Sequence, residues 1–291
     1  MAVNPAWLTP RARAVRRRTA RITSRLLLAI SLLVLCGCSI AQLTPTVVMS
    51  APSLPRPTAT SAPRDTGWQS IGAGVEYREL QIEQGDRSDR LRLARIDPAQ
   101  TRLRVLYDPD RPRRVSTWLS ESRALVAVNG NFFDPQNHAL GLVIQDGQRR
   151  DGVVYQGFGG MLAVSGDEVR VRWNVPEPYN GEPLTYALQN FPMLVLPGGS
   201  PNLDIDDNGR AAPRTAAAQD RSGRLIFVVS PLPAFTLTEF GQWLAASDLD
   251  LEAALNLDGG TSSGLVLRSG NRNLGTDSWV EVPNVIVAEK R

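Results

Sequence analysis

The sequence predicts an α+β fold: a strand-rich single domain with mixed or antiparallel sheets and a few helices. Two observations support this prediction. Short segments in which apolar and polar residues alternate recur from Val75 to Val287, with Gly, Asp and Pro in the turns between them. Helical spacing is clear in one segment only, which opens with the capping box Thr236-Leu237-Thr238-Glu239 and places Phe240, Trp243 and Leu244 on one face.

The first 37 residues have the pattern of an export signal. Seven arginines precede a mainly apolar stretch of ten residues, Leu26 to Leu35, which is shorter than the roughly 20 residues that a membrane-spanning helix needs. The segment Leu35-Cys36-Gly37-Cys38 resembles a bacterial lipobox, with Cys38 as the lipidated residue. We therefore predict a lipoprotein signal peptide over residues 1–37 and anchoring through lipid on Cys38 at the outer face of the bacterial membrane. An ordinary signal peptide or an uncleaved anchor is the alternative.

Loss of this signal changes the charge of the chain. The full chain is +3, but without those seven arginines 25 basic residues remain against 29 acidic ones, so the mature protein carries about −4. A nucleic-acid partner therefore does not follow from the basic composition. Cleavage also removes Cys36, so the exported domain has no disulfide. Residues 38–66, rich in Pro, Ser and Thr, are predicted to be an extended linker, and residues 67–291 to be one domain.

The expected elements of this domain follow from the alternating pattern. One short helix is expected from a cap at Ser116 through Arg123, before the helix at Thr236. Turns are expected at Asp146-Gly147, Ser165-Gly166-Asp167 and Asp220–Gly223. The expected strands are Val75–Ile82, Arg90–Ile96, Leu103–Tyr107, Leu125–Val128, Leu140–Ile144, Met161–Val164, Val169–Trp173, Leu184–Leu188, Met193–Leu196, Thr215–Gln219, Leu225–Val229, Ala253–Leu257 and a strand from Leu265.

Several catalytic motifs are excluded by what the chain lacks. Gly260 to Gly264 spells G-x-S-x-G, but a strand pattern follows it, and the only histidine, His138, lies upstream. One histidine and one lysine argue against a histidine-based zinc site and against Schiff-base chemistry. Asp204–Gly209 matches the start of a calcium loop, but its twelfth position is Thr215. We predict a solvated turn there, with no metal or cofactor; bound calcium is the alternative.

Three segments at strand ends carry the polar groups of a candidate site: Asn129–Asp134, Pro213–Thr215 and Asn256–Ser263. Arg214 has the chemistry to clamp a phosphate or carboxylate, although a surface salt bridge is the alternative. Asp258 precedes two glycines and three hydroxyl residues, a pattern that suits a polar, anionic ligand but also a simple turn capped by Asp. Core packing is expected for at least one of Phe132 and Phe133.

These segments resemble the phosphodiester glycosidase family. The family motif Asn-Gly-Gly-Phe-Phe is matched by Asn129 to Phe133, Arg-Thr-Ala-x-Gly by Arg214 to Ala218, and Asn-Leu-Asp-Gly-Gly-Gly-Ser-Ser by Asn256 to Ser263. Asn190 to Val195 loosely matches a further segment, and Val282 to Val287 resembles the last family strand. Three residues depart from glycines of the family, Asn131, Ala218 and Thr261. A β-branched Thr261 resists a positive φ, which puts the loop shape and the substrate in question.

The resemblance implies hydrolysis of a sugar C1–O bond whose leaving group is a phosphodiester. It implies Asp258 as the carboxylate, nucleophile or base, and Arg214 as the phosphate ligand. Asn129 and Asp134 complete the expected catalytic set, and Asp134 and His138 are the candidate acids. Substrate contacts are expected from Asn131, Asn256, Gly259, Gly260, Thr261, Ser262, Thr215 and His138. Two alternatives stay open: a glycosidase acting on phosphate-free cell-wall or extracellular polysaccharide, and a non-catalytic sugar-binding lipoprotein.

Overall fold

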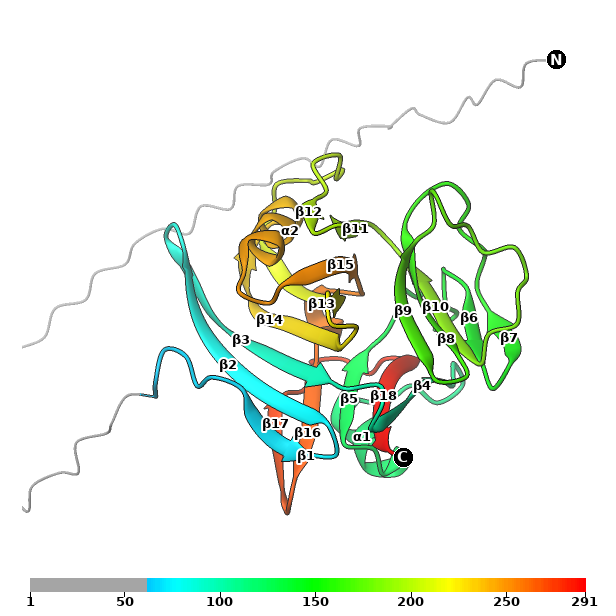
Figure 1. The fold of residues 1–291 in the computed structure, drawn as a ribbon, viewed down its shortest axis with the longest axis horizontal. Helices are drawn as coiled ribbons and strands as arrows, with labels where there is room; N and C mark the ends of the chain where they lie inside the picture. The colour runs from blue at the N-terminus through cyan, green and yellow to red at the C-terminus, as the bar shows by residue number, and fades with distance from the viewer. Residues whose placement is uncertain (1–61) are drawn as a thin grey trace, which may run out of the picture. The chain divides into compact units, whose positions relative to one another are not determined.

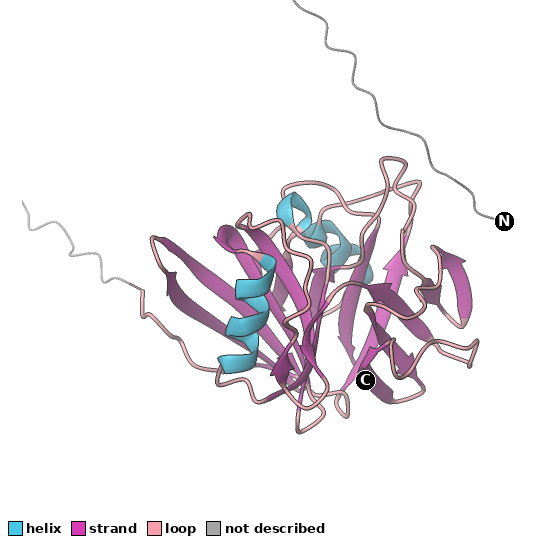
Figure 2. Cartoon of the chain, turned by 90° about the horizontal axis from the view of Figure 1, so that it is seen from above, coloured by secondary structure: helices cyan, strands magenta, loops and turns pink. Residues whose placement is uncertain are grey.

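A computed structural model describes residues 62–291, which fall within one compact unit spanning residues 59–291. The predicted signal peptide, Cys38 and most of the predicted linker lie outside the described residues. The described part is built from three sheets, two α-helices and one short 3-10 turn (Figures 1 and 2). No helix within it is long and apolar enough to cross a membrane.

The largest sheet has eight strands in the order β1-β2-β3-β14-β13-β15-β11-β12. Its strands are β1 (Gln69–Gly72), β2 (Val75–Gln84), β3 (Arg87–Ile96), β11 (Met193–Leu196), β12 (Ser200–Pro201), β13 (Ala212–Asp220), β14 (Leu225–Phe235) and β15 (Leu251–Asn256). The central strand β13 contains the candidate segment Pro213–Thr215 near its start, and β15 leads directly into the segment Asn256–Ser263.

Two five-stranded sheets complete the fold. The first, in the order β7-β6-β10-β8-β9, contains β6 (Val143–Gln145), β7 (Gln148–Asp151), β8 (Gly160–Ser165), β9 (Glu168–Trp173) and β10 (Tyr186–Asn190). The second, in the order β17-β16-β5-β18-β4, contains β4 (Thr101–Tyr107), β5 (Val126–Asn129), β16 (Leu265–Ser269), β17 (Arg272–Thr276) and β18 (Asn284–Lys290). Strand β5 leads into the third candidate segment.

Side chains that alternate along the strands are buried on both faces of the large sheet. On β14, Phe227 and Val229 point into the main core, whereas Ile226 and Val228 point to the opposite face of the sheet. Helix α2 (Leu237–Ala246) covers that opposite face with buried Phe240 and Leu244. Helix α1 (Val115–Ser122) covers the outer face of the β5–β18 sheet in the same way.

Most expected elements are present, often with extended bounds. The capping box of α2 is confirmed: Thr236 Oγ1 accepts from the Glu239 amide at 3.3 Å, and Glu239 Oε2 accepts from the Thr236 amide at 2.8 Å. The hairpins β8–β9 and β13–β14 are confirmed as antiparallel pairs. Asp146 and Gly147 both have positive φ (54° and 75°), as the predicted two-residue turn requires.

Three expectations need correction. Every strand pair is antiparallel and strands far outnumber helices in the described part, so the fold is mainly β and the α+β label fits loosely. Ser116 lies inside α1, whose N-cap is Arg114, because Ser116 donates its amide and hydroxyl to Asp277 of a distant loop. Arg64 and Thr66, placed in the linker by the sequence, hydrogen-bond to β2 through their backbones.

Candidate active site

Strand β15 carries Asp258 to the rim of the large sheet, where loops from both sides hold its backbone. The Asp258 amide donates to the carbonyl of Gly130 at 3.0 Å, and its carbonyl accepts from Asn129 Nδ2 at 2.7 Å. Leu257, immediately before it, is fully buried and donates its amide to the Thr215 carbonyl at 2.9 Å. The position of Asp258 is therefore set by all three candidate segments.

Asn129 joins these segments from inside the protein. It is fully buried, and its Oδ1 accepts from Thr215 Oγ1 at 3.0 Å and from the Gly264 amide at 3.1 Å. Because its Nδ2 donates to the Asp258 carbonyl, both ends of the amide are satisfied by the protein. Asn129 and the equally buried Thr215 therefore position the Asp258 loop rather than face a ligand.

The Asp258 loop forms one wall of a cavity of about 370 Å³. Polar lining comes from Asn256, Asp258, Gly259 and Gly260 at the end of β15, from Arg214 on β13 and from Asp206. Apolar lining comes from Phe132, Phe191, Pro192, Leu237 and Leu257. The structure thus brings five predicted site residues together: Arg214, Asn256, Asp258, Gly259 and Gly260.

Burial controls the acidity of Asp258. It raises the pKa of the carboxyl to about 6, against the hydrogen bonds from the Ser262 hydroxyl and the Gly259 amide, which lower it. The Gly259 amide lies 2.9 Å from Asp258 Oδ1. Asp258 is therefore a largely buried carboxyl group that ionises at about pH 6.

Arg214 brings a positive charge to the same cavity and forms no ion pair with a carboxylate of the described residues. Its Nε donates to the Phe235 carbonyl at 3.2 Å and its Nη2 to the Arg210 carbonyl at 2.9 Å. No carboxylate of the described residues lies within 4.0 Å of the guanidinium, since Arg214 forms none of their ion pairs. Burial lowers the pKa of Arg214, and the charge of Asp207 raises it. An arginine pKa is so far above neutral that the group stays cationic.

The acidic turn before β13 has two roles that the sequence did not separate. Asp207 accepts from the Thr238 amide at 2.7 Å at the start of α2 and from the Gly209 amide at 3.0 Å. Burial opposes its ionisation, but these bonds outweigh burial and lower the pKa of Asp207 to about 2. Asp206, one residue earlier, is exposed and lines the cavity. Sequence reasoning missed Asp206, because nothing distinguishes it from its acidic neighbours.

Two predicted residues, Asp134 and His138, do not line this cavity. Asp134 Oδ1 accepts from the amides of Gln136 and His138, both at 2.9 Å, and so closes a turn. His138 lies with Nδ1 3.0 Å from Asp151 Oδ2 and is largely exposed. Their predicted acid role therefore has no support from the cavity geometry.

The remaining predicted residues lie around the loop. Asn131 is buried, donates Nδ2 to the Gly141 carbonyl at 2.9 Å and is not a cavity residue. Thr261 is exposed at the rim, whereas buried Ser262 directs its hydroxyl at Asp258. Neither Asn131 nor Thr261 has a positive φ, so both replacements of family glycines fit without strain.

Phe132 and Phe133 have different surroundings in the structure. Phe133 packs against the core beneath α1, whereas Phe132 lines the cavity beside Phe191. The two lining rings have centroids 5.1 Å apart. The Phe132 side chain is therefore in a position to contact a ligand, and Phe191 is a second lining residue that only the structure identifies.

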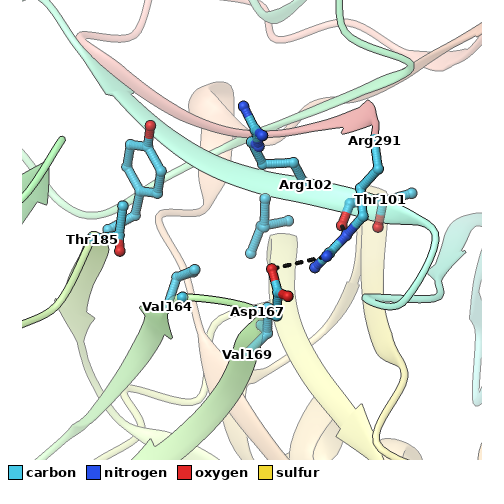
Figure 3. A pocket seen from close by; sticks show the side chains of 10 residues that line it. Thr101, Arg102, Val164, Asp167, Val169, Thr185 and Arg291 are labelled. Atoms are coloured by element: carbon cyan, nitrogen blue, oxygen red, sulfur yellow. Dashed lines mark hydrogen bonds and ion pairs between the residues drawn. The ribbon is translucent and has the colours of Figure 1, made fainter.

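A second cavity in the described part has a different character. This cavity, of about 260 Å³, lies between β4 and the β8–β9 hairpin and contains Arg102 and Arg291 (Figure 3). Arg291 pairs with Asp167 at 2.8 Å, and Arg102 lies 4.0 Å from Glu289. The Arg291 charge is therefore paired with a carboxylate, unlike that of Arg214.

Comparison with known proteins identifies the class. The phosphodiester glycosidase profile matches residues 122–289, more than half of the chain, so the chain belongs to the phosphodiester glycosidase family. Membership supports a hydrolase acting on a carbohydrate or sugar-phosphate substrate. The match contains the Asn129, Arg214 and Asp258 segments, and none of the curated proteins matches the sequence.

Solved structures share the fold at low identity. The catalytic domain of zebrafish N-acetylglucosamine-1-phosphodiester α-N-acetylglucosaminidase, auto-inhibited by its pro-peptide, is 17% identical with a TM-score of 0.59, and the alignment covers 80% of this chain and 85% of that one. A hypothetical protein from Synechocystis is 18% identical with a TM-score of 0.54, covering 75% of this chain and 62% of that one. At such identities the likeness shows the fold alone.

Proposed function

We propose that the protein hydrolyses a sugar C1–O bond in a sugar-1-phosphodiester. The observation that carries this proposal is that Asp258 lines one cavity with Arg214, whose side chain donates only to backbone carbonyls among the described residues. A phosphodiester substrate supplies the anion that Arg214 lacks, and cleavage at C1 develops positive charge that a carboxylate stabilises. Family membership and the name of the zebrafish relative support the same bond.

The reaction needs a water molecule and a group to take its proton. In the proposed step, the water oxygen bonds to C1, the C1–O bond to phosphate breaks, and the bonding electrons leave with a phosphomonoester. A phosphate leaving group needs little protonation. Asp206 is exposed to solvent and lines the cavity, so we assign it as the base that accepts the water proton. Ionised Asp258 stabilises the sugar cation, and Arg214 holds the phosphate.

A direct assay tests this function. The purified full chain is incubated with a panel of hexose and N-acetylhexosamine 1-(methyl phosphate) diesters, and free reducing sugar and methyl phosphate are measured. We expect equal amounts of both products from at least one diester and none with Asp258→Asn. Release of sugar from phosphate-free polysaccharide alone, or sugar binding without release, would overturn the proposal and favour one of the two alternatives.

The place of action is a further part of the proposal. We infer export and lipid attachment at Cys38 from the sequence pattern, which lies outside the described residues. Cys38→Ser is expected to abolish acyl labelling and to release the protein from the membrane fraction, because stable attachment depends on the acyl chains. Unchanged labelling and fractionation would refute this assignment.

We also infer that the acidic turn needs no calcium. Two hydrogen bonds from the protein already occupy the Asp207 carboxylate, and the described residues contain no group of three or more His, Cys, Asp or Glu able to hold a metal. Millimolar calcium is expected to leave the melting temperature unchanged. A calcium-dependent rise that Asp204→Ala abolishes would contradict this inference.

A further inference from the structure

The order of strands in the large sheet gives the cavity a charged side and an aromatic side. Strand β15 lies between β13, which carries Arg214, and β11, which Phe191 and Pro192 precede (Figure 1). The Asn256 amide donates to the Pro192 carbonyl and its Nδ2 to the Phe191 carbonyl, both at 3.0 Å. The Asp258 loop therefore begins between the guanidinium on one side and the Phe191 ring on the other.

The aromatic side continues past the cavity as a row of rings. Phe191 lies 5.1 Å from Phe132, 5.8 Å from Phe158 and 5.6 Å from Tyr155, measured between ring centroids. Tyr155 is buried and packs against Phe158 at 4.8 Å. Phe158 is 47% exposed and Phe191 39%, and Phe158 lies outside the lining of the cavity. The row therefore offers apolar ring surface to a group that extends out of the cavity.

The backbone around Phe158 is held by the protein interior. Asn174 is fully buried, and its Nδ2 donates to the Phe158 carbonyl at 3.2 Å while its amide donates to the Gly159 carbonyl at 3.1 Å. These bonds hold the backbone at the exposed Phe158 and at the glycine that follows it. An exposed ring on an anchored loop is pre-organised for binding, since little further ordering is needed.

The chemistry of the bond to be cleaved decides which part of a substrate reaches this row. With phosphate on Arg214 and C1 beside Asp258, the aglycone lies beyond the phosphate on the charged side. The sugar then lies on the aromatic side. The C–H groups on one face of a pyranose ring give it an apolar surface that an aromatic ring can cover.

We propose that Phe158, with Phe191, forms a subsite for a second sugar ring, so that the substrate is an oligosaccharide carrying a phosphodiester at C1. This inference rests on the proposed function. The sugar that loses its phosphate contacts Phe132 and Phe191 within the cavity, and the sugar linked to its non-reducing side stacks on Phe158. The row therefore selects substrates by glycan length.

Matched substrates test the subsite. For each monosaccharide diester in the panel, the corresponding 1,4-linked disaccharide diester is assayed, and the ratio of kcat/KM for disaccharide over monosaccharide is measured. We expect a ratio of about ten for the wild type, the size of one aromatic stacking contact. Phe158→Ala should bring the ratio close to one, and Phe158→Tyr should preserve it. Leu232→Ala is the control, because Leu232 is 48% exposed and is neither a cavity residue nor part of the row.

The outcomes separate the subsite from the proposed function. Hydrolysis of monosaccharide diesters with a wild-type ratio near one would overturn the subsite and leave the function standing. An effect of Phe158→Ala on monosaccharide diesters with long alkyl aglycones, but not on the ratio, would place the aglycone on the row and also overturn it. If no diester is cleaved, the proposed function fails, and calorimetry with the free sugars decides the subsite. Tighter binding of disaccharide that Phe158→Ala abolishes supports it, and equal binding refutes it.

Discussion

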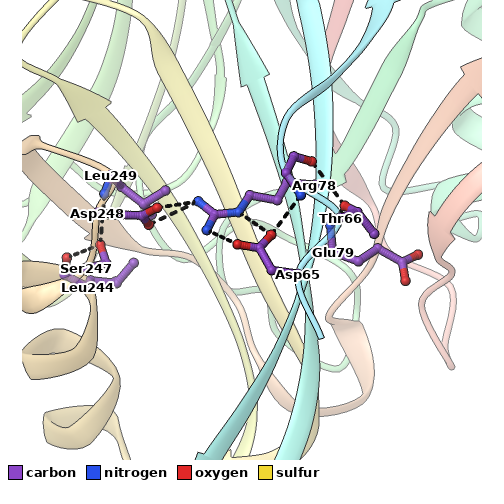
Figure 4. A network of polar contacts seen from close by, with 9 residues as sticks. Asp65, Thr66, Arg78, Glu79, Leu244, Ser247, Asp248 and Leu249 are labelled. Carbon is purple, nitrogen blue, oxygen red and sulfur yellow. Dashed lines mark hydrogen bonds and ion pairs between the residues drawn. The ribbon is translucent and has the colours of Figure 1, made fainter. Parts of the chain in front are cut away.

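Arg78 is buried and Arg214 is partly buried in this domain, and the two guanidinium groups have different partners. The Arg78 side chain is 7% exposed and makes two hydrogen bonds to Asp65, at 2.9 and 2.6 Å, and two to Asp248, at 3.0 and 2.8 Å (Figure 4). It ties the start of the domain and the loop after α2 to β2. Arg214 donates only to backbone carbonyls, in a cavity that also contains Asp258.

The positive charges of Arg78 and Arg214 therefore have different roles. A guanidinium that holds two carboxylates has its donors occupied, so its contribution is to the folded state. A guanidinium oriented by carbonyls keeps its net charge available to an incoming anion. Removing Arg78 should therefore affect stability, and changing the cavity should affect binding and chemistry.

The largest expected effect is at Asp258. Asp258→Asn keeps the acceptor for the Gly259 amide but removes the negative charge, so kcat should fall about a thousandfold or more. In the wild type, kcat/KM should fall as the pH drops through about 6, where Asp258 becomes protonated. A near-normal rate for Asp258→Asn in the sugar-release assay would remove Asp258 from the mechanism.

The same substitution should raise the stability of the folded protein, although it lowers the activity. Because burial raises the pKa of Asp258 to about 6, the folded protein binds its proton more tightly than the unfolded chain does. The wild type therefore loses stability as the pH rises from about 4 to above 6, by roughly 3 kcal/mol. Asp258→Asn should melt several degrees above the wild type near pH 8 and match it near pH 4. Scanning calorimetry at both pH values measures this difference, and a lower melting temperature for the variant near pH 8 would contradict it.

The next largest effect is expected at Asp206. Asp206→Asn should lower kcat about a hundredfold, because the attacking water loses its proton acceptor. Azide, which needs no deprotonation, should restore turnover and form a glycosyl azide. Asp204→Asn is the matched control in the same exposed turn, outside the cavity lining, and should keep the wild-type rate. Equal losses in both variants would show that Asp206 acts only through the turn.

A smaller effect is expected at Arg214, and it should depend on the substrate. Arg214→Ala should raise KM for phosphodiesters about tenfold to a hundredfold and change that for aryl glycosides much less, since only the former carry the anion. The melting temperature should stay close to that of the wild type, because the side chain has no carboxylate partner among the described residues. Equal losses on both substrate types would refute phosphate binding by Arg214.

Arg78→Ala completes the comparison with the smallest effect on catalysis. It should lower the free energy of unfolding by about 2 kcal/mol, less than for a fully buried pair, because Asp65 and Asp248 remain 42% and 63% exposed. Denaturant titration measures this loss, and kcat/KM of the folded fraction should be unchanged. If Arg78→Ala left the stability unchanged, or specifically weakened phosphodiester binding, the proposed difference between the two arginines would be wrong.

The sequence by itself determined the local elements and the core of the site. Thr236 and Glu239 make their capping box within one turn of helix, and Asp146-Gly147 makes its hairpin turn, because both depend on residues close in the chain. The motif around Asp258 was likewise recognisable, since two glycines and three hydroxyl residues follow a buried strand. These features need no knowledge of distant contacts.

Only the tertiary structure decided which polar residues face a ligand. Asn129 has the same chemistry as Asn256, but it is fully buried and its amide is satisfied by Thr215, Gly264 and Asp258 from distant segments. The order β13-β15-β11 sets Arg214 and Phe191 on opposite sides of Asp258, and the raised pKa of Asp258 comes from burial. Burial, charge pairing and strand order arise from contacts between residues far apart in the chain, so a pattern of neighbouring residues does not contain them.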